Sequence, residues 1–239
     1  MPFSPARPRY TRPMTSPSPP AGGRITDLAQ QAHDAERLNV FLDGAFAFGL
    51  SREVALREGL RLGDELDPAR VAALRAADDV AKATTNALAL LARRPRSERE
   101  VRDRLRQKGY APEAIDAAVA KLAGWRYLDD ADFARYWVEN RAAHQPRGRR
   151  LLEQELRHKG VARDTVKETI AEADLDEQTA ALDLARKNLR SYAGQELPVV
   201  RRRLAAYLAR RGYGWDVARP VLDRLLGEHD DEPADTNAE

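Results

Sequence analysis

Apolar residues recur at helical spacing through the second half of the chain, and the same pattern occurs three times. Each occurrence contains a similar string, LRQKGY, LRHKGV or LARRGY, whose glycines Gly109, Gly160 and Gly212 are 51 and 52 residues apart. A leucine stands four residues before each glycine, and further aliphatic residues stand eight before and ten after it. A fixed period of this length indicates tandem copies of one supersecondary unit.

Each unit is predicted to contain three helices, with the repeated glycine just past the end of the second. A glycine there takes the left-handed conformation, and the next residue (Tyr110, Val161 or Tyr213) folds back onto the leucine in a Schellman motif. Ser97 and Glu100 have the spacing of a capping box. The expected first helices span about 81–93, 131–143 and 177–190, the second 97–108, 148–159 and 198–211, and the third 112–123, 163–173 and 215–226.

The region before the repeats has a different pattern. Between Ile25 and Leu50 it is β-like, and Asp43-Gly44 is the pair that a type I′ hairpin turn favours. A helix is then expected from the cap Ser51 to a stop at Gly63. Asp67-Pro68 predicts a further helix start, with helical periodicity towards Arg93 and a break near Asp78-Asp79.

The sequence therefore predicts a mainly α protein. Tandem three-helix repeats form an elongated solenoid-like array, preceded by a small N-terminal β-hairpin region and helix. Seven of the 14 prolines fall within the first 20 residues, and Met14 is an alternative start to Met1. The expected divisions are a disordered Pro/Arg-rich tail (1–24), the hairpin and helical region (25–79), three repeats (80–130, 131–176 and 177–227) and a disordered acidic tail (228–239).

Composition narrows the function classes. The chain of 239 residues has no cysteine, which excludes disulfides, thiolate catalysis and Cys-ligated metals. Its four histidines never stand three or four residues apart, so we expect no metal site. No apolar run is long enough for a membrane span, and no signal peptide is visible, so a cytoplasmic protein is expected. Phosphate-binding glycine motifs and a catalytic triad are also missing, so we expect no cofactor and no enzyme.

Charge is segregated along the chain, although the formal total is only +2. The second-helix segments Arg93–Lys108, Arg147–Lys159 and Arg201–Arg211 carry net charges of +5, +3 and +5. The segments that follow the first two, Ala111–Asp130 and Val161–Glu177, carry −2 and −4. A polarised surface is expected. Codon usage in a GC-rich genome is an equal explanation for the many arginines.

Helical geometry selects candidate interface residues among these bases. Positions ten and three before each repeat glycine share one face, opposite the apolar core. The candidates for a binding surface are Arg99, Arg106, Arg150, Arg157, Arg202 and Arg203. An ordinary solvated face is the alternative. Lys108, Lys159 and Arg211 are better explained by the helix dipole.

Other notable residues are assigned structural roles. Ser97, Gly109, Trp137 and Gly160 are expected to support the fold. One residue of Asp129-Asp130 is predicted to cap a helix rather than form an acid pair. Core packing is favoured over base stacking for the tryptophans Trp125, Trp137 and Trp215.

At this point the chain resembles a known family. ALALLARRPRSEREVRDRLRQKGY (87–110), WRYLDDADFARYWVENR (125–141) and PRGRRLLEQELRHKG (146–160) are similar to the RecX family of recombination regulators. The hairpin NVFLDGAFAFGLS also matches a segment that many members carry. The resemblance covers about residues 25–227. The third repeat departs most, with Arg211 in place of lysine and Pro220 inside its last helix.

The resemblance implies a tandem-repeat protein that binds RecA recombinase. Family members lodge in the groove of the RecA–DNA filament and inhibit ATP hydrolysis, strand exchange and co-protease activity. A monomer with RecA as partner, and single- or double-stranded DNA within the filament as a further contact, is therefore expected. The competing hypothesis is a helical DNA-binding module or transcriptional regulator, because helix–turn–helix pairs with a glycine turn are common in DNA readers. The acidic or neutral third helices disfavour sequence readout.

Overall fold

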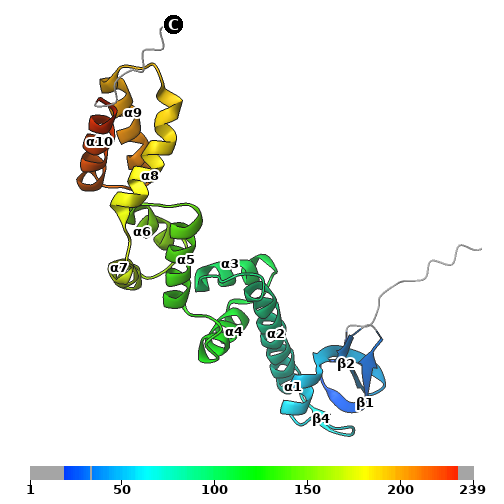
Figure 1. Ribbon diagram of the computed structural model, residues 1–239. Helices are drawn as coiled ribbons and strands as arrows, with labels where there is room; N and C mark the ends of the chain where they lie inside the picture. The colour runs from blue at the N-terminus through cyan, green and yellow to red at the C-terminus, as the bar shows by residue number, and fades with distance from the viewer. Residues whose placement is uncertain (1–18, 33, 231–239) are drawn as a thin grey trace, which may run out of the picture. The chain divides into compact units, whose positions relative to one another are not determined.

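The computed structural model describes residues 19–32 and 34–230 (Figure 1). The chain divides into two compact units, one up to Lys82 and one from Ala83. The expected disordered tails lie largely outside the described residues, with two exceptions. The first strand already begins at Gly23, and the last helix continues to Asp230, because Gly227 does not interrupt it. No helix in the described ranges is long and apolar enough to cross a membrane.

The first unit contains a four-stranded antiparallel sheet in the order β3-β2-β1-β4. The strands are β1 (Gly23–Gln31), β2 (Asp34–Leu42), β3 (Ala45–Ser51) and the short β4 (Glu65–Leu66). The predicted hairpin turn is confirmed, since Asp43 and Gly44 both have positive φ, 49° and 81°. The sequence did not reveal β4, whose two residues are too few for a strand pattern.

Helix α1 (Arg52–Arg57) begins at the expected cap, where the Ser51 hydroxyl accepts the Val54 N–H over 3.3 Å. The prediction of a stop at Gly63 is wrong. Gly59 has the left-handed φ of 68°, and Leu60 N–H donates to the Ala55 carbonyl over 3.0 Å. The chain therefore reaches a Schellman ending at the first available glycine.

Helix α2 (Pro68–Leu91) begins where Asp67 accepts the Arg70 N–H over 2.6 Å, as predicted. It is one continuous helix, so the predicted break at Asp78-Asp79 is wrong (Figure 1). Asp78 is only 1% exposed, and its carboxylate accepts from Arg37, Lys82 and the Ser51 N–H. The acidic residue therefore anchors the helix to the sheet of the first unit.

The second unit consists of three-helix repeats, as predicted. The helices are α3 (Glu98–Gln107), α4 (Pro112–Gly124), α5 (Asp130–His144), α6 (Arg149–His158), α7 (Arg163–Glu172), α8 (Glu177–Leu189), η1 (Arg190–Tyr192), α9 (Leu197–Arg210) and α10 (Trp215–Asp230). The C-terminal part of α2 is the first helix of repeat 1. Each repeat has its own apolar cluster, so the repeats are built as separate small cores.

The three repeated glycines end helices α3, α6 and α9 as predicted. Their φ angles are 85°, 91° and 90° for Gly109, Gly160 and Gly212. In each case the next N–H donates to the leucine carbonyl at the start of the last turn, over 3.1–3.3 Å. The leucine and the residue after the glycine belong to the same apolar cluster in all three repeats. The Schellman motif therefore explains each helix end.

The other capping predictions are confirmed in part. Asp129 caps α5 by accepting the N–H groups of Ala131 and Asp132. Ser97 accepts the Glu100 N–H over 3.2 Å, but the Glu100 carboxylate does not complete the capping box. It binds Arg94 and Lys159 instead. Ion pairs thus replace the expected bond to the Ser97 N–H.

Candidate protein and nucleic-acid interface

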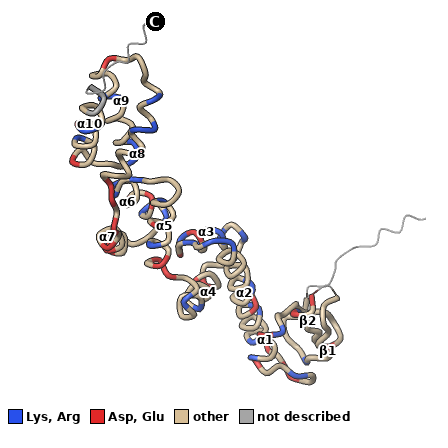
Figure 2. Tube along the Cα trace, viewed as in Figure 1, with Lys and Arg blue, Asp and Glu red and all other residues tan. Residues whose placement is uncertain are grey.

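The six candidate arginines lie on the second helices of the repeats, and all are exposed. Arg99 and Arg106 are on α3, Arg150 and Arg157 on α6, and Arg202 and Arg203 on α9. In Figure 2, basic positions mark α3 and acidic positions mark α7. We refer to these six residues as the arginine row.

The arginine row is partly neutralised in repeat 1. Asp103 lies between Arg99 and Arg106 on α3 and forms ion pairs with both. Arg99 and Arg106 are 60% and 59% exposed at the side chain, so these pairs are solvated and weak. Their positive potential is nevertheless reduced by the shared carboxylate.

The row is less neutralised in repeats 2 and 3. Arg150, Arg157 and Arg202 form no ion pair with any residue that the structure describes. Arg157 donates from Nε to the Glu153 carbonyl over 3.4 Å. Arg203 lies over the Tyr192 ring, 5.7 Å from its centroid. The arginines of α6 and α9 are therefore the freer cations of the row.

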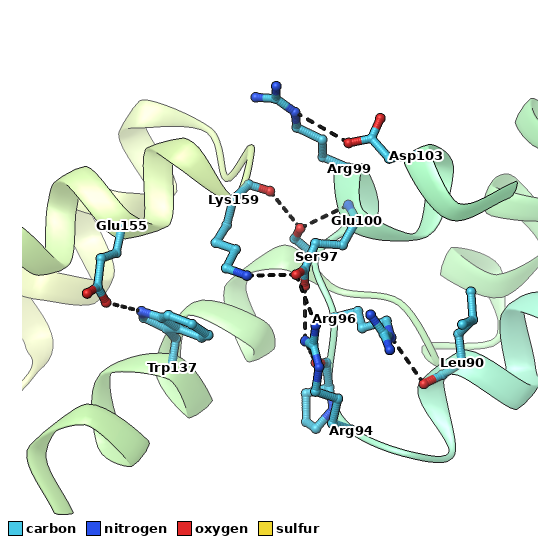
Figure 3. Close-up of polar contacts among 11 residues, drawn as sticks. Leu90, Arg94, Arg96, Ser97, Arg99, Glu100, Asp103, Trp137, Glu155 and Lys159 are labelled. Atoms are coloured by element: carbon cyan, nitrogen blue, oxygen red, sulfur yellow. Dashed lines mark hydrogen bonds and ion pairs between the residues drawn. The ribbon is translucent and has the colours of Figure 1, made fainter. Parts of the chain in front are cut away.

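Helices α3 and α6 meet end to end, as Figure 3 shows. The Ser97 hydroxyl, at the start of α3, donates to the backbone carbonyl of Lys159, at the end of α6, over 2.6 Å. Gly160 lies so close to Arg99 that a Cβ there would be 2.5 Å from the Arg99 Cβ. The repeat glycine therefore has a second role, because it permits close approach between neighbouring repeats.

Glu100 holds this junction electrostatically. Its carboxylate accepts from the Arg94 guanidinium over 3.1 and 3.2 Å and from Lys159 Nζ over 2.7 Å (Figure 3). Burial alone would raise the pKa of Glu100, but the bonds from Arg94 and Lys159 outweigh it and lower the pKa to about 2. Glu100 is therefore charged at neutral pH and links the two repeats.

Trp137 supports the same lysine. Lys159 Nζ and the Arg141 guanidinium lie 4.8 and 4.4 Å from the Trp137 ring centroid. The indole N–H donates to Glu155 over 2.8 Å, and Arg141 donates to the same carboxylate over 2.8 Å. The structural role predicted for Trp137 agrees with this partly buried cation–π arrangement.

Helices α6 and α9 meet in the same way. Gly148 N–H, at the start of α6, donates to the Arg211 carbonyl, at the end of α9, over 2.9 Å. A Cβ on Gly148 would collide with the Gly212 backbone, and a Cβ on Gly212 would collide with Leu151. Helices α3 and α6 thus each place the N-terminus against the C-terminus of the next second helix, an arrangement that aligns the dipoles.

Carboxylates from the following repeat complete both junctions. Asp130 of α5 accepts the Glu98 N–H over 2.8 Å, and Glu177 of α8 accepts the Arg149 N–H over 2.8 Å. Burial raises the pKa of Asp130, and nearby Glu98 and Asp129 raise it further. The repetition of this contact shows that the two junctions share one design.

End-to-end contact places one residue of the arginine row at each junction. Arg99 lies beside Gly160 at the first junction, and the Arg150 guanidinium approaches Gly214 at the second. The sequence predicted the stripe on each helix but not these contacts between the helices. The sequence signal for the close contact at the second junction was Gly148, which takes the position that Ser97 has in repeat 1.

The tryptophan predictions are wrong for two of the three residues. Trp125 and Trp215 are 48% and 56% exposed, because each lies at a helix end rather than within an apolar stripe. Only Trp137 packs against a core cluster. Two of the three tryptophans therefore contribute exposed aromatic surface.

These features define a helical-repeat protein, in which three three-helix units follow a small antiparallel sheet in the chain and exposed arginines lie on the second helices. Family models for the RecX N-terminal domain and the first, second and third RecX three-helix domains match residues 23–67, 83–122, 129–170 and 176–222. The chain belongs to the RecX family.

Individual relatives agree over most of the chain. Regulatory protein RecX of Bacillus velezensis is 35% identical over 209 residues, which cover 87% of this chain and 80% of that protein. Regulatory protein RecX of Clostridium botulinum (strain Alaska E43) is 33% identical, over 85% of this chain and 96% of its own length. These proteins are regulators by name, so the chain belongs to a regulatory protein family.

Solved structures support the fold. A crystal structure of regulatory protein RecX matches with a TM-score of 0.72 at 26% identity, over 84% of this chain and 98% of that one. RecX from Lactobacillus salivarius matches with a TM-score of 0.57 at 22% identity, over 62% of this chain and 97% of that one. The second match concerns the fold alone.

Proposed function

We propose that this protein binds the RecA filament and inhibits its ATPase, recombinase and co-protease activities. Membership of the RecX family supports a regulatory role. The observation that carries the proposal is the arginine row, whose members are exposed on α3, α6 and α9, three helices that meet end to end at two junctions. Arginine suits this role because its planar guanidinium binds carboxylates and phosphates bidentately.

The arginines of α6 and α9 make the stronger contacts in this proposal. Arg150, Arg157 and Arg202 have no ion-pair partner among the described residues, whereas Asp103 engages both row residues of α3. A partner carboxylate or phosphate need not displace an internal one at α6 or α9. The proposal implies a monomer that needs no cofactor and works in the cytoplasm with RecA.

A titration of RecA ATPase on single-stranded DNA tests the proposal. We expect inhibition by the wild-type chain, and a curve shifted to higher protein concentration for R150E/R157E. The control is R163E/K167E, which makes the same charge change on exposed positions of the acidic helix α7. Circular dichroism should show that both variants are folded.

Two results would count against the proposal in different ways. If equimolar wild-type protein leaves the ATPase unchanged, RecA inhibition is wrong. If the protein inhibits but R150E/R157E behaves like the wild type, the function stands and the arginine row has no part in it.

DNA binding without RecA is the second candidate, favoured by the absence of acidic residues from α9. Phosphate binding through the arginine row would depend steeply on salt and little on sequence. Tight, sequence-selective binding at about 200 mM salt would instead support a transcriptional regulator. Electrophoretic mobility at several salt concentrations separates these outcomes.

A further inference from the structure

Repeat 1 has a groove that the arginine row does not include. It encloses about 510 Å³ and is lined by the end of α2, the α2–α3 loop, the α4–α5 turn and the first turns of α5. Leu88, Leu91 and Phe133 give it an apolar lining, and Tyr127 and Tyr136 add aromatic rings. A mostly apolar groove with a few polar groups is the usual form of a ligand site.

Aromatic rings beside this groove are exposed. Tyr127 and Tyr136 are 63% and 38% exposed. Trp125 meets Tyr127 edge to face, with centroids 6.5 Å apart, and Lys121 Nζ lies 4.7 Å from the Trp125 centroid. Rings that are accessible and flanked by cations are the elements of a base-stacking platform.

The groove contains a residue in an unfavourable backbone conformation. Arg126 has φ of 61° at the end of α4, where Tyr127 N–H donates to the Leu122 carbonyl over 3.0 Å. This is the Schellman position that Gly109 occupies at the end of α3. An arginine is strained there, and its side chain forms no ion pair with any residue in the described ranges. Its charge is thus placed at the groove despite a conformational cost.

Two arginines, Arg96 and Arg126, and two aspartates, Asp129 and Asp132, line the groove. Arg96 donates from Nε to the Leu90 carbonyl over 3.2 Å (Figure 3). Burial lowers the pKa of Arg96, and the neighbouring charges of Arg94, Arg104 and Arg93 lower it further. The acidic residues of the groove are already engaged, since Asp129 caps α5 and Asp132 pairs with Arg135. Arg96 and Arg126 form no ion pair with any described residue, so they are the groups that an anionic ligand would contact.

We propose that the groove binds single-stranded DNA, with bases stacked on Tyr127 and Tyr136 and flanking phosphates bound by Arg96 and Arg126. Aromatic rings favour a nucleic acid over an acidic peptide, because unpaired bases stack on exposed rings whatever their sequence. The choice of DNA over RNA rests on the proposed function at RecA filaments. The site itself is separate from the six residues of the arginine row.

Fluorescence anisotropy of a labelled oligo(dT), with the full chain and no RecA, tests the stacking. We expect Y127A/Y136A to weaken binding by about tenfold or more, and Y127F/Y136F to bind like the wild type because the rings remain. W215A is the control, since Trp215 is equally exposed on α10 but far along the chain from the groove. Binding of duplex DNA should change little, because its bases are already stacked.

Arg126→Gly gives a test in which folding and binding change in opposite directions. Glycine relieves the strain, so the melting temperature should rise or stay constant, while affinity for oligo(dT) should fall several-fold. Arg126→Lys should retain most of the affinity. A variant that binds oligo(dT) like the wild type would overturn the role of Arg126.

The outcomes distinguish this site from the arginine row. Equal affinity of Y127A/Y136A and the wild type for oligo(dT) would overturn the proposal, as would tighter binding of oligo(rU) than of oligo(dT). If the wild type binds an acidic peptide but no oligo(dT), and Y127A/Y136A no longer binds that peptide, the groove would be assigned to a protein partner instead. Failure of RecA inhibition with intact oligo(dT) binding would refute the proposed function alone.

Discussion

Lys159 and Glu100 are 59 residues apart in the chain, yet Lys159 Nζ lies 2.7 Å from a carboxylate oxygen of Glu100. The backbone carbonyl of the same lysine accepts the Ser97 hydroxyl. Both ends of the lysine therefore bind the first turn of α3. This contact joins repeats 1 and 2, which otherwise have separate apolar clusters.

Replacing Glu100 by glutamine should lower the free energy of unfolding at pH 7 by about 2 kcal/mol, because bonds from two cations lose their charge assistance. The pKa of Glu100 is lowered to about 2 from 4.5. Its contribution is thus fully present above about pH 4.5 and is lost as the pH falls towards 2. Urea unfolding of both proteins at pH 7 and pH 3 measures this. A difference independent of pH would contradict the assignment.

Alanine substitution of two repeat glycines should distinguish the stability that comes from the helix end from the stability that comes from the contact between repeats. Gly109→Ala should cost about 1–2 kcal/mol through the left-handed backbone alone, since its Cβ would meet open space. Gly160→Ala should cost a further amount of about 1–3 kcal/mol, because its Cβ would press on Arg99. Chemical denaturation compares them. Equal losses of unfolding free energy in the two variants would show that Arg99 moves away from the new Cβ without destabilising the junction.

Serine at Gly148 should destabilise the chain although serine is normally the better helix cap. The added Cβ would collide with the Gly212 backbone and disturb the Gly148–Arg211 hydrogen bond. We expect a loss of about 1–3 kcal/mol. Ala162→Ser is the control, because it caps α7 at an exposed position and should stabilise slightly. Thermal melts showing both variants stabilised would be inconsistent with a tight junction.

Asp78→Asn should weaken the first unit by about 3–5 kcal/mol, since Arg37 and Lys82 would lose a buried counter-charge. Burial alone would raise the pKa of Asp78, but bonds from Arg37, Lys82 and the Ser51 N–H lower it below 3.8. Its contribution is therefore present above about pH 3.8 and lost as the pH falls further. Asp79→Asn, at an exposed neighbour, should change stability by less than about 0.5 kcal/mol. Similar effects of the two substitutions in denaturant titrations would refute the anchoring role.

Much of the fold was predictable from residues close together in the chain. The three Schellman endings, the Asp129 cap and the Asp43-Gly44 turn depend on local backbone preferences, and all were found as expected. The exposed arginines also followed from helical periodicity. Their role as a binding surface stays a prediction.

Two of the wrong predictions have a common cause, contacts with residues far along the chain, whereas the tryptophan predictions failed for a local reason. Asp78-Asp79 resembles a helix break, but Asp78 is held by Arg37 and Ser51 from strands that no local pattern connects to it. Glu100 resembles a capping-box partner, but a lysine from the next repeat competes for it. Trp125 and Trp215 have apolar neighbours in sequence, yet their position at helix ends leaves them exposed.

Hydrophobic spacing and turn chemistry act over a few residues, so the sequence was sufficient for the number of repeats, the helix ends and the face on which the arginines lie. Contacts between residues some fifty positions apart require the folded chain. Only the tertiary structure showed that two of the glycines, Gly160 and Gly212, are also points of close approach between repeats. It also showed that the ends of α3, α6 and α9 meet, because the Ser97 hydroxyl donates to the Lys159 carbonyl and the Gly148 N–H donates to the Arg211 carbonyl.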